Sequence, residues 1–171
     1  MRKKTKRTIL IFTAALLIVL GVYTAMDLFS RSDAKAYEAN WHISIPCDLK
    51  KQYGARSEDN LFGDGYEYTV YSCPEGEFLP FFNGAYSRKN SILQKKVTEI
   101  LDDLKVEKQN RPDFSHKYQW KIFVNKGNYI NTISENDTES AYDVSAHDVY
   151  DLLYIIYDTD SHLVYFAQDV L

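Results

Sequence analysis

The longest uninterrupted apolar segment lies near the amino terminus. Nineteen uncharged residues, Thr8 to Met26, separate Arg7 from Asp27 and are rich in Ile, Leu, Val, Ala and Phe. As a helix this run would be about 28 Å long, close to the hydrocarbon thickness of a bilayer. Only a helix satisfies all of the backbone groups of such a segment in lipid. The pattern therefore predicts a transmembrane anchor over residues 8–29.

The charges around this segment predict its orientation. Residues 1–7 are strongly basic, whereas the charges after the segment are mixed. Basic flanks stay in the cytoplasm, so we expect a single-pass plasma-membrane protein whose carboxyl-terminal domain, residues 41–171, lies outside. Residues 30–40 are polar and are predicted to be a linker. The alternative is a signal peptide cleaved after Ala36, which would give a secreted protein.

Alternation of apolar and polar residues predicts strands in the first part of the domain. Residues 41–45 alternate and stop at Pro46, whereas residues 48–60 are charged and are predicted to be a loop. A Gly-Asp-Gly turn at residues 63–65 precedes a second alternating strand, residues 66–71.

The period then changes to that of a helix. Apolar residues from Leu93 to Leu104 form one stripe, and Asn90 or Ser91 can cap its start. Strands follow at 119–124, 129–134, 152–157 and 163–168, with turns at 125–128 and 158–161. We therefore predict an α+β domain of order β-β-α-β-β-β-β, whose mainly antiparallel sheet is covered on one face by the helix.

Charge is distributed unevenly along the chain. Residues 1–36 carry seven Lys/Arg and two Asp, and the remainder carries 13 Lys/Arg and 22 Asp/Glu, a net charge of −9. So acidic a domain has no general attraction for nucleic acid. Residues 127–171 hold nine acids, Glu135, Asp137 and Glu139 among them, and no Lys or Arg. This surface either offsets the basic stretch 88–126 within the fold or recruits a cationic protein partner.

Two cysteines, Cys47 and Cys73, each adjoin a proline. In an exported protein such a pair usually forms a disulfide, so we expect these two residues to be bridged. A nucleophilic cysteine is the alternative.

An aromatic segment, Phe78-Leu79-Pro80-Phe81-Phe82, interrupts the pattern and is predicted to be a loop. Phe78, Phe81 and Phe82 either fold back and complete the core or form an exposed apolar patch that binds a partner or the bilayer surface.

Motifs for catalysis and metal binding are absent from the sequence. Asp158, Asp160, His162 and Asp169 fit positions of a calcium loop, but Leu163 replaces its required glycine. The four histidines lack zinc-site spacing. We therefore expect neither metal nor cofactor, and no catalytic residues.

Two short patterns resemble small exported, membrane-anchored proteins of Gram-positive bacteria: Trp41-x-Ile43-x-Ile45-Pro46, and Phe62-Gly63-Asp64-Gly65-x-x-Tyr68-x-Val70. The resemblance implies a bacterial envelope setting and no particular activity. The sequence thus favours a membrane-tethered, non-catalytic interaction module, of the immunity type or an envelope accessory protein. The alternative is a small cell-envelope hydrolase whose site is assembled from scattered residues.

Overall fold

The computed structural model describes residues 13, 16–19, 21, 34–46, 48–57, 65–82, 89–127, 129–133 and 150–170. Among them, no helix is long and apolar enough to cross a membrane. Most of the predicted anchor, residues 8–29, lies outside the described residues, so the anchor stays a prediction.

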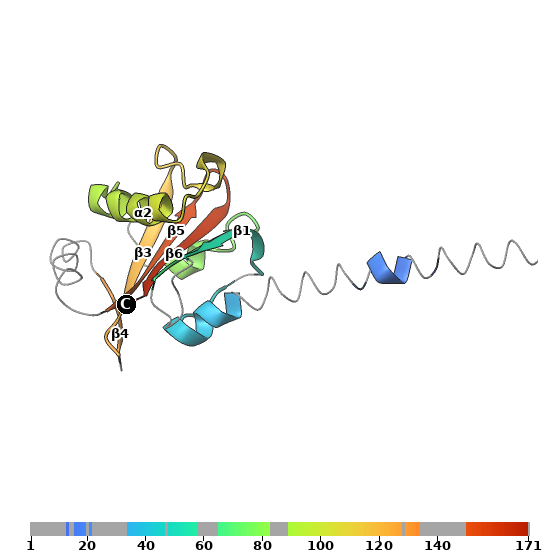
Figure 1. Ribbon diagram of the computed structural model, residues 1–171, viewed down its shortest axis with the longest axis horizontal. Coiled ribbons are helices and arrows are strands. Elements are labelled where there is room, and N and C mark those ends of the chain that lie inside the picture. The colour runs from blue at the N-terminus through green and yellow to red at the C-terminus, as the bar shows by residue number, and fades with distance from the viewer. Residues whose placement is uncertain are drawn as a thin grey trace, which may run out of the picture.

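Six strands form one antiparallel sheet (Figure 1). In chain order they are β1 Lys50–Arg56, β2 Gly65–Ser72, β3 Tyr118–Asn125, β4 Ile130–Thr132, β5 Asp151–Asp158 and β6 Leu163–Val170, and across the sheet the order is β1-β2-β6-β5-β3-β4. Strand β5 is buried along almost its whole length because it lies inside the sheet. The apolar run at 152–157 predicted this central strand, and the prediction is confirmed.

Helix α2, Ser91–Asp103, covers one face of the sheet, as predicted (Figure 1). Its buried side chains are Leu93, Val97, Ile100 and Leu101. The side-chain oxygen of Asn90 accepts hydrogen bonds from the backbone N–H groups of Ile92 and Leu93, both at 3.0 Å. The amide thus satisfies two N–H groups that have no partner within the helix.

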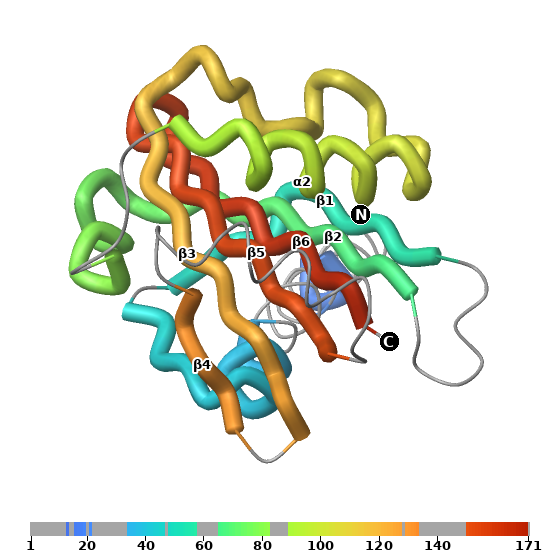
Figure 2. The backbone as a smooth tube through the Cα atoms, turned by 90° about the vertical axis from the view of Figure 1, so that its left-hand side faces the viewer, coloured from blue at the N-terminus to red at the C-terminus, as the bar shows by residue number. Residues whose placement is uncertain are grey.

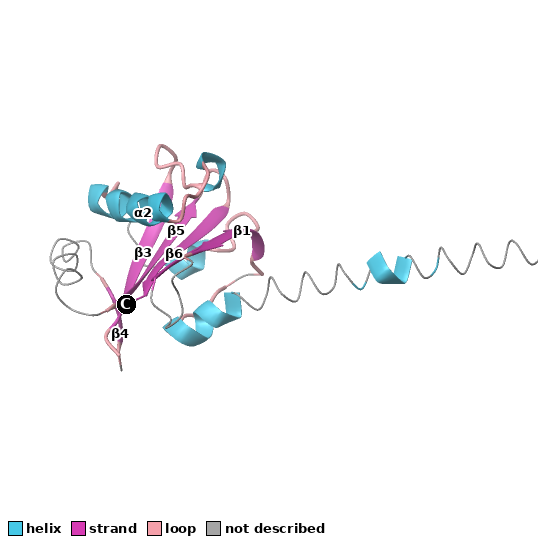
Figure 3. Ribbon diagram, in the orientation of Figure 1, coloured by secondary structure: helices cyan, strands magenta, loops and turns pink. Residues whose placement is uncertain are grey.

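The opposite face is also covered, in part by a helix that the sequence did not predict. A helix over residues 34–41 lies on the far side of the sheet from α2, and a 3-10 helix, Leu79–Phe82, lies on the same side (Figure 3). Tyr37 and Trp41, one helical turn apart, are buried in this second core. Residues 34–40, expected in a linker, therefore belong to the folded domain.

The predicted strand at 41–45 is wrong. Trp41 ends the helix, and Ile43 and Ile45 follow outside any helix or strand, where they pack against the second core. The first strand is instead β1, within the predicted loop 48–60. This strand is at the edge of the sheet and mostly exposed, so its sequence lacks apolar alternation.

Candidate functional site

The second face of the sheet changes from aromatic to polar toward one end. Near the middle, Phe123, Ile155 and Phe166 pack under the added helices. Further along the same strands and on the same face come Asn125, Asp151 and Gln168, because successive residues alternate between faces. The polar ends lie beside the helix over 34–41, in the lower part of Figure 2.

A hollow of about 400 Å³ lies between that helix and the strand ends. Its lining combines amide, carboxylate and guanidinium groups with the helix surface: Ala36, Tyr37, Asn40, Trp41, Arg56, Gly65, Glu67, Asn125, Asp151, Gln168 and Val170. Small-molecule pockets are mostly apolar, so a hollow lined by these polar groups suits a polar or charged group of a partner instead.

Hydrogen bonds and one ion pair hold the walls of the hollow. The indole N–H of Trp41 donates to Gln168 Oε1 at 3.3 Å, which ties the helix to β6. Asn125 Nδ2 donates to Asp151 Oδ2, also at 3.3 Å. Arg56 Nη2 lies 3.6 Å from Glu67 Oε2, with the arginine side chain 66% exposed. An ion pair that is so exposed to water contributes little stability, and both of its side chains stay available to a ligand.

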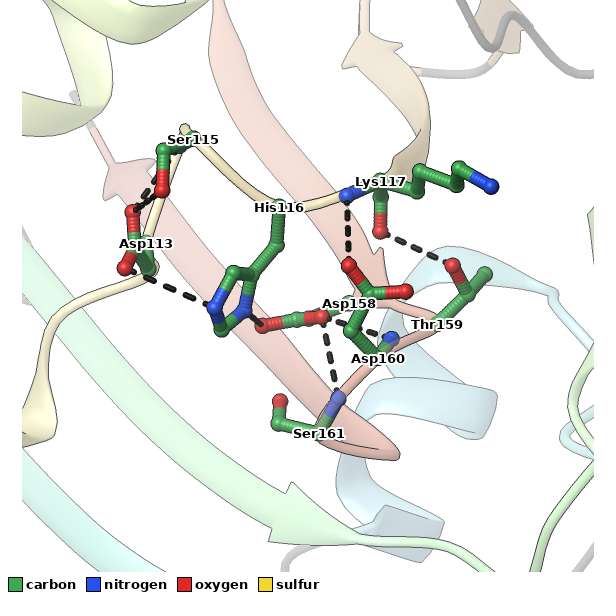
Figure 4. A network of polar contacts seen from close by, with 8 residues as sticks. All are labelled: Asp113, Ser115, His116, Lys117, Asp158, Thr159, Asp160 and Ser161. Carbon is green, nitrogen blue, oxygen red and sulfur yellow. Dashed lines mark hydrogen bonds and ion pairs between the residues drawn. The ribbon is translucent and has the colours of Figure 1, made fainter.

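A second polar cluster occupies the opposite end of the sheet (Figure 4). Asp158 ends β5 and is 2% exposed. Its Oδ1 accepts hydrogen bonds from the backbone N–H groups of Asp160, at 2.9 Å, and Ser161, at 3.1 Å. This Asp-centred turn produces the predicted hairpin at 158–161, which is confirmed.

His116, just before β3, contacts the same aspartate. Its Nδ1 donates to Asp158 Oδ2 at 2.8 Å, and its Nε2 lies 3.6 Å from Asp113 Oδ2. Asp160 Oδ2 accepts from the backbone N–H of Lys117 at 3.1 Å. The cluster thus joins two segments about forty residues apart, because the β3–β5 register places Tyr118 opposite Asp158.

These contacts shift the pKa values of both partners. The hydrogen bond and negative charge of Asp158 raise the pKa of His116 above its ordinary value, and the charges of Asp113 and Asp160 add to this effect. Burial alone would raise the pKa of Asp158, but hydrogen bonds from His116, Ser161 and Asp160 outweigh burial and lower it. The site therefore favours the ion pair.

The candidate partner-binding aromatics lie mostly inside the protein. Phe78 and Phe82 are 0% and 3% exposed, and Phe81 is half-buried. Lys121 Nζ donates to the carbonyl oxygen of Phe81 at 2.5 Å and lies 5.0 Å from the centre of its ring. Of the two readings of this segment, the structure shows completion of the core; Leu79 alone of residues 78–82 exposes a large side chain, 42%.

The other candidates from the sequence lie partly outside the described residues. Glu135, Asp137 and Glu139 are among these, as is Cys47. Cys73 is buried. The acidic partner surface and the disulfide therefore stay predictions.

The chain matches no protein-family model, no curated protein and no solved structure. Inference about function accordingly rests on the hollow and on the cluster around His116. Sequence patterns did not indicate the hollow, and of the cluster they singled out only Asp158 and Asp160, in the rejected calcium loop, because each site gathers residues that are distant along the chain.

Proposed function

We propose that this protein is a membrane-tethered, extracytoplasmic interaction module, of the immunity type or an envelope accessory protein, which binds a partner with a cationic surface. The hollow beneath the helix over 34–41 carries the proposal. It is concave and polar, and one of its walls is the element that directly follows the predicted anchor. The partner would therefore bind on the side of the domain where the chain leaves the membrane.

The charges around the hollow support a cationic partner. Two carboxylates, Glu67 and Asp151, line it together with one guanidinium, that of Arg56. Asp151 also follows directly on the acidic segment that contains Glu135, Asp137 and Glu139. A surface of this sign accelerates association with a basic partner and selects against acidic ones.

The helix over 34–41 offers a matched pair of alanines for a test. Ala36 and Ala39 are both exposed, but only Ala36 lines the hollow. We expect Ala36→Trp to fill the hollow and to reduce partner recovery at least about tenfold, the effect of losing roughly 1.4 kcal/mol of binding free energy. Ala39→Trp should leave recovery unchanged. Pull-downs from native membranes with the full chain, quantified by mass spectrometry, measure both.

Two further arms test the charge of the partner. Recovery should fall as salt rises, because exposed charges are screened beyond about 8 Å at physiological ionic strength. Neutralising Glu135, Asp137 and Glu139 together should slow association while the fold remains intact. Equal recovery with Ala36→Trp and Ala39→Trp, or no partner for the parent chain, would contradict the proposal.

A small cell-envelope hydrolase is the second candidate, and one observation favours it. His116 donates Nδ1–H to the buried Asp158, as catalytic histidines do to their orienting carboxylate. The Nε2 side, where a serine hydrolase holds its hydroxyl nucleophile, faces Asp113 instead. Ester or amide hydrolysis that disappears in His116→Asn, with partner binding retained, would favour the hydrolase.

A further inference from the structure

Three potential metal ligands converge at the end of the sheet opposite the hollow. His116, Asp158 and Asp160 each offer one nitrogen or oxygen atom, and these atoms all lie within 4.8 Å of one another. Donors that bind one ion at about 2.1 Å are separated by no more than about 4.2 Å. If the distances between these donor atoms shortened by less than an ångström, all three could bind one ion.

The carboxylates are already held in place by the backbone. Asp158 directs Oδ1 to the N–H groups of its own turn, which leaves Oδ2 on the His116 side. Asp160 Oδ2 accepts from the N–H of Lys117, and the other oxygen of this carboxylate points away from His116 (Figure 4). Metal ligands are typically oriented by such outer hydrogen bonds. A carboxylate oxygen has two lone pairs, so Asp160 Oδ2 can coordinate an ion beside Asp158 Oδ2 while it still accepts from the backbone.

The imidazole is oriented in the same manner. When Nδ1 faces an ion beside Asp158, Nε2–H points toward Asp113 Oδ2, now 3.6 Å away. A histidine that ligates through one nitrogen and donates to a carboxylate through the other is the common arrangement in metal sites. The histidine also distinguishes this site from a cluster of acidic residues alone, because the nitrogen ligand comes from a different segment of the chain than the two aspartates.

The cluster itself carries an excess of negative charge, and Lys108 acts on Asp113 from outside it. Three carboxylates, those of Asp113, Asp158 and Asp160, surround one imidazole, and the side chain of Lys117 extends away from them (Figure 4). Even a protonated His116 leaves two negative charges. A divalent cation that displaces this proton would leave a net charge of −1 in the cluster.

We propose that His116, Asp158 and Asp160 bind one divalent transition-metal ion of the Zn²⁺ class, with Asp113 orienting the imidazole. Binding displaces the proton between His116 Nδ1 and Asp158 Oδ2, and this proton leaves to solvent. Imidazole nitrogen favours Zn²⁺, Ni²⁺ and Cu²⁺, whereas Ca²⁺ and Mg²⁺ prefer oxygen ligands alone. The site is independent of the proposed partner, because it lies at the other end of the sheet.

Zn²⁺ titration of the full chain tests this proposal, with free metal measured by a competing chromogenic chelator. The parent should bind one Zn²⁺ per chain. His116→Asn keeps an amide donor toward Asp158 but removes the imidazole, and should weaken affinity at least about tenfold, a loss of the size typical around metal sites. Asp160→Asn should weaken affinity in the same direction. His42→Asn, at an exposed histidine elsewhere, is the matched control and should bind as the parent does.

Excess Ca²⁺ should not displace Zn²⁺ from the parent. Circular dichroism checks that His116→Asn is folded; if it is not, Asp160→Asn carries the test, since Asp160 is exposed and Asn can still accept from Lys117. Unchanged Zn²⁺ affinity in the folded variant, the absence of saturable binding to the parent, or equal displacement by Ca²⁺ would each overturn the proposal.

Discussion

Phe78 and Phe82 illustrate how a single residue's surroundings decide between two roles that its sequence leaves open. Both rings pack against Tyr157 on the second face of the sheet: Phe78 is tilted, with its centroid 5.8 Å away, and Phe82 is stacked, with its centroid 6.1 Å away. Pro80 predicted a break in regular structure, and the break is a 3-10 helix that turns both rings inward. The sequence of an aromatic segment with a proline is therefore the same whether the segment completes a core or binds a partner.

Replacing Phe82 with Ala should lower the free energy of unfolding by about 3–5 kcal/mol, because the change leaves a cavity beside Tyr157. Leu79→Ala is the matched control in the same segment. Its side chain is 42% exposed, so we expect a loss of under about 1 kcal/mol. Urea unfolding of the full chain measures both values. Equal, small losses for the two variants would show that Phe82 is not a core residue.

At the scale of elements, prediction succeeded where periodicity was strong. The stripe from Leu93 to Leu104 predicted α2, and the run at 152–157 predicted β5. Prediction from periodicity failed for the helix over 34–41. Only Tyr37 and Trp41 of its eight residues are buried, and two positions do not define an apolar stripe. The prediction also missed strand β1, because an edge strand needs no apolar face and its sequence therefore carries no strand pattern.

The candidate sites were less predictable than the fold. The turn at 158–161 could be placed, but His116 joins it only through the pairing of β3 with β5. The hollow likewise combines the helix over 34–41 with the ends of distant strands. Strand register over such separations does not follow from local patterns, so neither site could be located in the sequence.

The amino-terminal cap of α2 gives an element-scale prediction. Asn90→Ala removes the acceptor for two N–H groups and should lower the free energy of unfolding by about 1 kcal/mol. Asn90→Ser keeps a capping oxygen and should cost only a fraction of that. Chemical denaturation compares the two variants with the parent. Equal losses would show that the amide stabilises the protein by a contact other than the cap.

For the whole molecule, the helix over 34–41 bears on the choice between anchor and signal peptide. Cleavage after Ala36 would start the mature chain at Tyr37, inside a helix whose Tyr37 and Trp41 are buried against the sheet. A site in that position would remove the first turn of a packed element. This supports retention of residues 8–29 as an anchor.

An alkaline phosphatase fusion after Leu171 should therefore be enzymatically active, because the carboxyl terminus is predicted to lie outside, and it should sediment with membranes. A fusion lacking residues 1–29 is the control and should be inactive in the cytoplasm. Active enzyme recovered from the medium would show that the amino-terminal segment is cleaved.

The packing of Tyr37 and Trp41 also sets how far the domain can stand from the bilayer. With residues 8–29 in the membrane, as predicted, only residues 30–33 separate the anchor from the packed helix. Four residues reach at most about 14 Å when fully extended. The hollow beside that helix would then lie close to the membrane surface. The hollow could then bind a ligand on a neighbouring membrane protein. A ligand farther from the bilayer would have to approach the membrane surface before it could bind.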